Sequence, residues 1–572
     1  MAKSAPKHFF SQNPSVNQQR SLFDMSKTDT VTLNPDYYYP NYCQLICPGD
    51  TVVLEYSNMI RLIDSLQVPM MDNLYCDTHF WFVAFDNVWD YTKNFFGEKK
   101  RPSDPDISTL PLIEFDSSDV TKPLPTCGDV YDYFGVPVVG TDNLLSGSFD
   151  INALPLMSYY LIHDDWIRDE QRCSYLLDTP DFKATTFKSS DFALYKRNKR
   201  FDYFTSTLLN PTGNATPTVL NLGGYAPVSA YDITGTNPSF SRVAPQHATI
   251  WQNAGETAFN NTSMPVVVAG MSDYTGTIDG LANNKFKYFN NSGSGGSVTA
   301  SNAGGLVPVN MYANLQSATG VSVEQMRRAF QVQAYHELLA KGGDRYTEYI
   351  YTMYGVINPD QQLERPEFLG STHQRLTVQP IASTADTSNA PLGNLGAIVS
   401  GGVSKPVFTR SFTKFGYIIG CINIYADLTY YQGLEKQWKL RDRMDLPLNV
   451  FANLTDQPVY KDEILLTGTS SDSEVFGYQE IYAWAKYAQN SLRGLVRPNV
   501  SSSIGYWSLA QTFTSVPVNN DTFIASNTPI DRITAVNTAN NVHHFICNQK
   551  FDVKLTRELP MHSDTMKWMF RG

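Results

Sequence analysis

The sequence of 572 residues is poor in charge and in cysteine pairs. Charged residues make up 17% of the chain, below the roughly 25% typical of soluble domains, and this composition excludes a coiled coil. The seven cysteines are scattered and form no Cys-x-x-Cys pair, which argues against a disulfide framework and a structural zinc site. We therefore expect free thiols in a protein that is made in a reducing cytoplasm.

Long apolar runs are also missing. The longest lie at Met264–Met271 and Tyr417–Leu428, well short of the roughly 20 residues that a membrane helix needs. The N-terminal segment 1–20 is polar and lacks the apolar run of a signal peptide. We expect neither membrane insertion nor secretion.

The sequence contains no nucleophile elbow, no phosphate-binding loop and no His-Glu-x-x-His motif. Asp164 and Asp165 are adjacent, so on a helix they would not face each other, and we expect them at a helix surface or an interface. His543 and His544 would point to opposite faces of a strand and could not share one metal ion. The chain is therefore predicted not to be an enzyme and to need no cofactor.

Aromatic residues are abundant, at 13%, together with 36 glycines and 32 prolines. This composition excludes whole-chain disorder and favours short strands joined by long loops. Residues 78–85 form a continuous apolar run, which predicts a strand buried on both faces, whereas 418–430 alternate as a strand with one buried face does. Further strands are predicted at 50–56, 505–513 and 551–557.

Two helices are expected between these strands. Residues 322–341 begin with a capping-box pattern, place Met326, Phe330, Ala334 and Leu338 on one face, and end at Gly342-Gly343. A second helix is expected from Leu154 to Arg172. Strands at both ends of the chain, with helices and loops inserted between them and no internal repeat, predict one antiparallel sandwich.

Four regions are expected along the chain. Residues 1–40 are predicted to be an N-terminal arm with little structure of its own, and 41–210 the first part of the core with helical insertions. Residues 211–320 hold only seven charged residues and predict a polar surface insertion, with a disordered linker as the alternative. Residues 321–572 would supply a helix and the second part of the core.

A basic cluster stands at residues 196–200. Because the formal net charge of the chain is −11, any contact with nucleic acid must be local. Basic side chains pair with phosphates, and neighbouring aromatic rings can stack on unpaired nucleotides. Two interpretations stay open: a solvated or interface-paired charge run with aromatics in the core, or single-stranded nucleic-acid contact by Lys196, Arg197, Lys199, Arg200 and Tyr203.

Several motifs occur in one order along the chain. The most specific block is Met326–Gly370, with RAFQ, AKGGDRY and RPEFLG, and further motifs are RFDYFTSTL at 200–208, ADLTYYQG at 426–433 and NTPIDR at 527–532. The chain resembles the major capsid proteins of Microviridae over about 70–560, and its long insertion resembles the gokushovirus branch. It departs from the family pattern at Tyr425, where arginine is expected.

The resemblance implies a mainly-β fold: a single eight-stranded antiparallel jelly roll of viral capsid type with long inserted loops and a few helices. It implies a T=1 icosahedral shell of on the order of sixty identical copies around a circular single-stranded DNA genome of a bacteriophage. The virion would be assembled in the bacterial host cytoplasm. A small basic DNA-binding protein, a minor capsid or pilot protein and a host surface receptor would be its partners.

Candidate surfaces follow from the same resemblance. The expected assembly-interface residues are Trp89, Arg168, Arg365 and Glu367. The expected host-facing residues, at the tip of a threefold protrusion built by the insertion, are Asn290, Ser292 and Ser294. The alternative function is that of a carbohydrate-binding or hydrolysing β-sandwich, which would need convergent carboxylates that the sequence does not offer.

Overall fold

The computed structural model describes residues 20–561 with internal gaps. The gaps are residues 64–65, 67–69, 100, 102–106, 141–144, 146, 178–185, 212–227, 231–284, 290–294, 300–310, 314–322, 344, 383–394, 453–455 and 535–542. The expected host-facing residues Asn290, Ser292 and Ser294 lie outside the described residues. Two compact units are present: residues 1–217 with 334–572, and residues 218–333.

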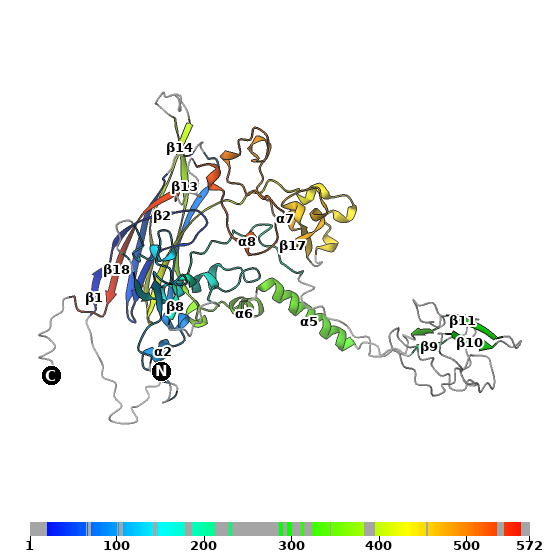
Figure 1. The fold of residues 1–572 in the computed structure, drawn as a ribbon, viewed down its shortest axis with the longest axis horizontal. Helices are drawn as coiled ribbons and strands as arrows, with labels where there is room; N and C mark the ends of the chain where they lie inside the picture. Colours follow the sequence, from blue (N-terminus) through cyan, green and yellow to red (C-terminus); the bar gives the residue numbers. More distant parts are fainter. Residues whose placement is uncertain are drawn as a thin grey trace. The chain divides into compact units, whose positions relative to one another are not determined.

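A curled antiparallel sheet forms the frame of the larger unit (Figure 1). Two short strands, β1 (Ser21–Asp24) and β2 (Lys27–Leu33), share one edge, because both pair with β18. The nine strands therefore occupy eight positions, and the predicted mainly-β jelly-roll class is confirmed. After that edge the order is β18 (Phe545–Arg557), β4 (Thr51–Leu62), β14 (Leu395–Ser411), β13 (Glu367–Ala382), β5 (Leu74–Ala84), β15 (Gly416–Ala426) and β3 (Tyr39–Ile46).

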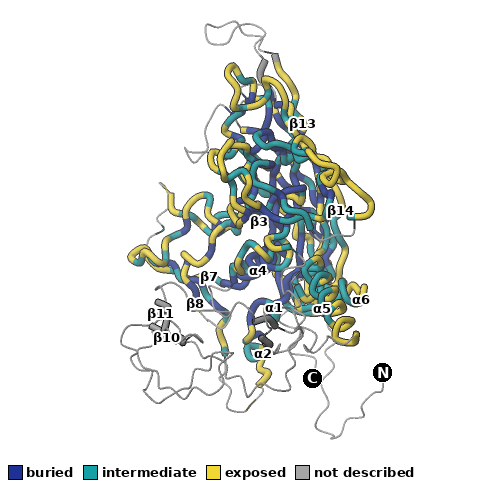
Figure 2. Tube along the Cα trace, turned by 90° about the vertical axis from the view of Figure 1, so that its right-hand side faces the viewer, coloured by how far each residue is buried: buried dark blue, intermediate teal, exposed yellow. Residues whose placement is uncertain are grey.

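The sheet curls because its two longest strands change partners along their length. Residues 367–376 of β13 pair with β5, whereas residues 377–382 pair with β14, which then pairs with β4 over 400–411. The two halves of the sheet enclose an aromatic core, in which the Tyr56 ring lies 5.1 Å from Phe551 and 5.7 Å from Phe80. Figure 2 shows these buried stretches along the strands.

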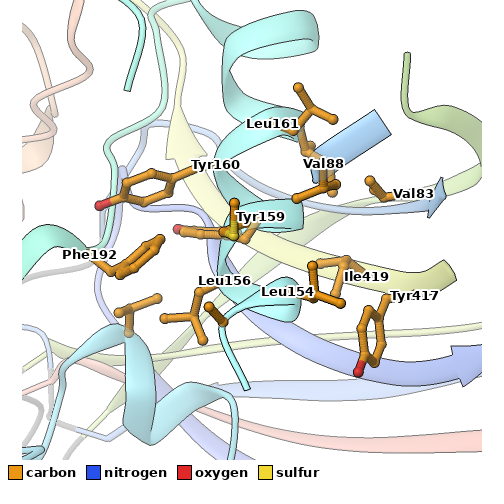
Figure 3. Packing of buried hydrophobic residues seen from close by; sticks show 14 of the residues in the cluster. Val83, Val88, Leu154, Leu156, Tyr159, Tyr160, Leu161, Phe192, Tyr417 and Ile419 are labelled. Carbon is orange, nitrogen blue, oxygen red and sulfur yellow. The ribbon is translucent and has the colours of Figure 1, made fainter. Parts of the chain in front are cut away.

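The opposite face of β5 and β15 is buried as well. The segment after β5 returns over the sheet, and its helix α4 (Leu154–Ile162) packs on β15. Figure 3 shows Tyr159 and Leu156 of α4 in the same cluster as Val83 and Ile419 of the sheet. The prediction that 78–85 is buried on both faces is confirmed. The prediction of one buried face for 418–430 is wrong, because α4 covers the second face and residues 416–425 are all buried.

The N-terminal segment is more ordered than predicted. Residues 1–19 lie outside the described part, but 21–33 form β1 and β2, and Leu33 is fully buried. The expectation of little structure is therefore wrong for this stretch. Its alternating Thr and apolar residues complete the exposed edge of β18, which leaves fewer unpaired backbone groups there.

Two other predicted elements differ from the structure. The second helix ends as an α-helix at Ile162 and continues as a π-helical turn, His163–Ile167, instead of reaching residue 172. Residues 505–513 are not a strand: Gly505–Trp507 form a 3₁₀ turn, and Leu509 donates its amide to the Asp72 carboxylate at 2.8 Å. The Asp72 side chain, two residues before β5, thus takes the place of a neighbouring strand as the partner of the Leu509 amide.

The helix predicted at 322–341 is confirmed as α5 (Val323–Gly342), although Ser322 lies outside the described residues. No residue of α5 is buried, so the predicted apolar face stays exposed within this chain. The smaller unit, residues 218–333, overlaps the expected insertion. Its described strands pair as β10 (Lys285–Phe289) with β11 (Gly295–Thr299), and β12 (Met311–Ala313) with β9 (Val228–Ala230).

A buried ion pair joins the two ends of the sheet. The Arg557 guanidinium, on the last strand, donates to the Asp50 carboxylate at 2.6 and 3.0 Å. Asp50 also accepts the Cys47 amide at 2.8 Å, and its side chain is 1% exposed. The turn between β3 and β4 is thereby attached to β18.

The buried thiols and phenols predict a loss of stability in alkali. All seven cysteines are free, as expected. Burial raises the pKa of the Cys43 and Cys547 thiols from 9.0 to about 12, and of the Tyr160 and Tyr417 phenols from 10.0 to about 12. These groups favour folding while neutral, so their contribution is complete below pH 9 and is lost as the pH rises toward 12.

We therefore expect the melting temperature of the purified chain to fall steeply between about pH 9 and 11. Thermal unfolding followed by intrinsic fluorescence at several pH values measures it, with 7 to 8 as the reference range. A melting temperature that stays level to pH 11 would contradict this account of the core.

Candidate nucleic-acid and assembly sites

The basic cluster at 196–200 runs beside β15, and the first of its two arginines, Arg197, points inward. The Arg197 guanidinium donates to Asn423 Oδ1 at 2.9 Å and lies 3.9 Å from the Tyr425 ring centre. It also meets the Asp77 carboxylate at 3.4 Å. Burial opposes the charge on Asp77, but the hydrogen bond from His373 and the Arg197 charge outweigh it and lower its pKa. Arg197 thus neutralises a buried acid of its own chain.

Two further residues of the predicted nucleic-acid site lie inside the protein. Lys199 is 8% exposed, its Nζ lies 4.2 Å from the Phe523 ring centre, and burial lowers its pKa to about 8. Tyr203 is 5% exposed and donates its hydroxyl to Glu463 at 3.0 Å. The prediction that these two contact nucleic acid is wrong, because core packing already occupies both side chains.

The exposed part of the cluster is Lys196, Arg200 and the neighbouring Phe201, which is 84% exposed. Arg200 lies 4.6 Å from the Tyr425 ring centre and 3.6 Å from Asp77. His373 of β13 meets the same carboxylate at 2.5 Å.

His373 and Arg375 extend this cationic and aromatic surface along β13. The His373 ring stacks on Tyr75 at 5.4 Å, and Arg375 donates to Asn73. Sequence reasoning missed both residues. They alternate with the buried residues Thr372 and Gln374, as residues of a strand do. Because these buried residues are themselves polar, the sequence shows no alternation of apolar and polar residues there.

Two of the expected assembly-interface residues are internal. Trp89 is 1% exposed and packs with Tyr91 and Phe95 in the cluster under α4. Arg168 is 8% exposed; it donates to the Cys173 carbonyl at 2.8 Å and covers the Tyr175 ring. The prediction that these two side chains contact neighbouring copies is wrong, because both are enclosed by their own chain.

Arg365 and Glu367, the other two, lie nearer the surface. The Arg365 guanidinium lies 4.2 Å from the Trp166 ring centre and pairs with Asp360 at 3.6 Å. Glu367 pairs with Arg410 on β14. Both residues shape the surface at the start of β13, and an interface role for them stays a prediction.

The adjacent acids have separate roles. Asp164, expected at a surface or interface, is fully buried and accepts the Leu176 and Leu177 amides at 3.0 and 3.1 Å. A surface position for Asp164 is therefore wrong, because the π-helical turn rotates it into the chain. Burial raises the pKa of Asp165 to about 6.

The two histidines contact different partners. His543 Nδ1 lies 2.8 Å from the Thr32 hydroxyl, whereas His544 Nε2 lies 3.4 Å from Asp531. No group of three potential metal-ligating side chains occurs among the described residues. In that same part of the chain, no helix is both long and apolar enough to cross a bilayer.

A curled antiparallel sheet with long inserted segments defines a jelly-roll protein of the viral capsid class. The family model described as "Capsid protein (F protein)" matches residues 11–567. The chain therefore belongs to this family of phage capsid proteins, which confirms the resemblance seen in the sequence.

Three curated relatives carry the name Capsid protein VP1. Those of Chlamydia phage 1 and Bdellovibrio phage phiMH2K are each 32% identical, and the alignments cover 98% and 92% of this chain and 98% and 91% of those proteins. The protein of Spiroplasma virus 4 is 29% identical, with 97% of each chain covered. The chain is thus a structural protein of a phage virion that assembles in multiple copies, and the carbohydrate-binding alternative is not supported.

Proposed function

We propose that this chain forms a T=1 icosahedral shell of on the order of sixty copies around a circular single-stranded DNA genome. Similarity over 98% of the length to a capsid protein of Chlamydia phage 1 supports a gokushovirus-like assignment. A small basic DNA-binding protein and a pilot protein would complete the particle. The net charge of −11 is compatible with a particle in which the small basic protein, and not the shell, neutralises the genome.

The surface around Arg200 is the proposed interior contact with DNA. Lys196 and Arg200 supply cations, and Phe201 and His373 supply exposed rings on which unpaired bases could stack. The exposure of Phe201, at 84%, is the observation that carries this proposal, because the described residues leave this ring largely uncovered. Stacking contributes about 1–3 kcal/mol per base in comparable sites.

Replacing Lys196, Arg200 and Phe201 together by Ala is expected to lower the DNA content per particle while leaving the sedimentation of closed shells intact. The ratio of absorbance at 260 and 280 nm in purified particles measures the effect. The control variant, Lys93→Ala with Arg493→Ala, removes two exposed cations elsewhere and should package normally. Unchanged DNA content in the triple variant would remove this surface from consideration.

The insertion at 211–320 is the proposed outward-facing element that meets a host surface receptor. Its low charge density supports an exposed location that does not repel an acidic cell surface. Its separation into a compact unit of its own, residues 218–333, is compatible with that role. Particles in which the tip residues Asn290, Ser292 and Ser294 are replaced should assemble and package DNA but adsorb poorly to host cells.

A further inference from the structure

A hollow lies beside α6 (Tyr346–Tyr354), in the larger unit. It encloses about 480 Å³, with walls that include Trp166, Tyr351, Val356 and Ile357. Arg345 and Arg365 lie in it together with Asp165, Glu348 and Asp360. Trp, Tyr and Arg side chains, which line this hollow together, are the types that contribute most of the binding energy at protein interfaces.

The rim of this hollow is exposed to an unusual degree for apolar side chains. Among the residues that line it, Tyr351, Val356 and Ile357 are 59%, 49% and 82% exposed, and no residue of α6 is buried. Exposed apolar side chains gathered around one hollow mark a candidate interaction site.

The charged groups in and around the hollow include more carboxylates than guanidinium groups. Arg345 is already held by Glu170 at 2.7 Å and by the Arg168 carbonyl at 2.9 Å, and Arg365 is held by Asp360 and the Trp166 ring. Around these two guanidinium groups stand the four carboxylates Asp165, Glu170, Glu348 and Asp360. A further cation entering the hollow would therefore be attracted.

A complementary surface occurs elsewhere on the same chain. The loop at 436–451 contains three short 3₁₀ turns, and every residue from 441 to 450 is exposed. Its apolar side chains Trp438, Met444 and Val450 are 72%, 65% and 86% exposed. Between them stand Arg441 and Arg443, which make no ion pair within the described part of the chain.

We propose that the hollow beside α6 of one copy receives the 436–451 loop of a neighbouring copy. Apolar side chains of the loop would cover the exposed rim, and Arg441 or Arg443 would meet the excess carboxylates. Contacts between two unlike surfaces generate rings where the rotation between copies closes, whereas a patch that meets its own copy gives a dimer. Figure 1 shows the loop, in yellow beside α7 (Ala483–Lys486) and β17 (Val475–Gln479), on a different side of the unit from α6. The inference rests on the proposed shell.

Surface substitutions give the first test. Ile357→Asp and Met444→Asp should each reduce the yield of closed particles at least about tenfold, because either places a charge in an apolar contact. Since both side chains are exposed in the single chain, the melting temperature of the unassembled protein should not change. Val120→Asp, at a residue 94% exposed outside both surfaces, is the control and should assemble normally. Normal particle yield from either test variant would overturn the proposal.

Cross-linking gives the second test. In a Cys127→Ser background, which removes the exposed native thiol, Ile357→Cys and Met444→Cys are combined in one chain. A short bismaleimide applied to assembled particles should join separate copies into a ladder of multiples of 64.1 kDa. Each single variant should stay at the mass of one chain.

Products joined only within one chain, or ladders from a single variant, would contradict a contact between unlike surfaces. If the variants assemble into DNA-filled shells with no cross-link, the shell stands and this interface fails. If the unaltered chain never forms closed particles with its partner proteins, the proposed shell itself fails.

Discussion

The substitution Trp89→Ala should destabilise the unassembled chain by about 3–5 kcal/mol, since it removes a fully buried ring and leaves a cavity in the core. Trp89 is 1% exposed, and its ring lies 6.2 Å from Tyr91 and 6.1 Å from Phe95. Equilibrium unfolding of the purified chain in denaturant measures the change.

Trp438→Ala, at a tryptophan that is 72% exposed, supplies the matched control and should leave unfolding of the single chain nearly unchanged. If Trp89→Ala unfolded as the unaltered chain does but no longer assembled, the interface role inferred from the sequence would be right after all. The two tryptophans thus separate a residue that holds the fold from one that is available to a neighbour.

Arg557→Ala should have an effect of similar size, about 3–5 kcal/mol, because it leaves the buried Asp50 carboxylate without its cation. The pair joins the turn before β4 to the last strand, so its loss should also expose the N-terminal strands β1 and β2 to proteolysis. Lys554→Ala, at an exposed position of the same strand, is the control. Denaturant unfolding and limited proteolysis measure the effect, and equal stability of the two variants would contradict the assigned role of the pair.

The sequence predicted strands correctly where continuous runs of apolar side chains are buried. The length and flanks of the continuous run at 78–85 favoured a strand covered on both faces over a helix, and β5 is buried in that way. The strands β13 and β14 were not predicted. Thr372 and Gln374 face inward from β13, and this polar character hides the two-residue period on which a strand prediction depends.

The burial of the residues in the basic cluster could not be predicted from the neighbouring sequence. The sequence gives no sign of which of its four basic side chains are buried. In the structure Arg197 and Lys199 are enclosed, whereas Lys196 and Arg200 are exposed. The difference comes from Asp77, Asn423 and Phe523, which are more than a hundred residues away along the chain. Only the pairing of β5 with β15 brings the first two together.

The same reasoning explains why recognised motifs were poor guides to interfaces. Trp89 and Arg168 belong to segments that resemble the capsid family, and both maintain the packing of their own chain. Exposed apolar residues do occur on α6 and on the 436–451 loop, which the sequence did not single out as surfaces.

A cryo-electron microscopy reconstruction of particles purified from cells that express this chain with its partner proteins tests the central claim most directly. The account predicts a closed icosahedral shell in which each asymmetric unit holds one copy of the curled jelly-roll sheet, with density for nucleic acid inside. A chain that stays a soluble monomer under these conditions, with no closed particles on the grid, would contradict it.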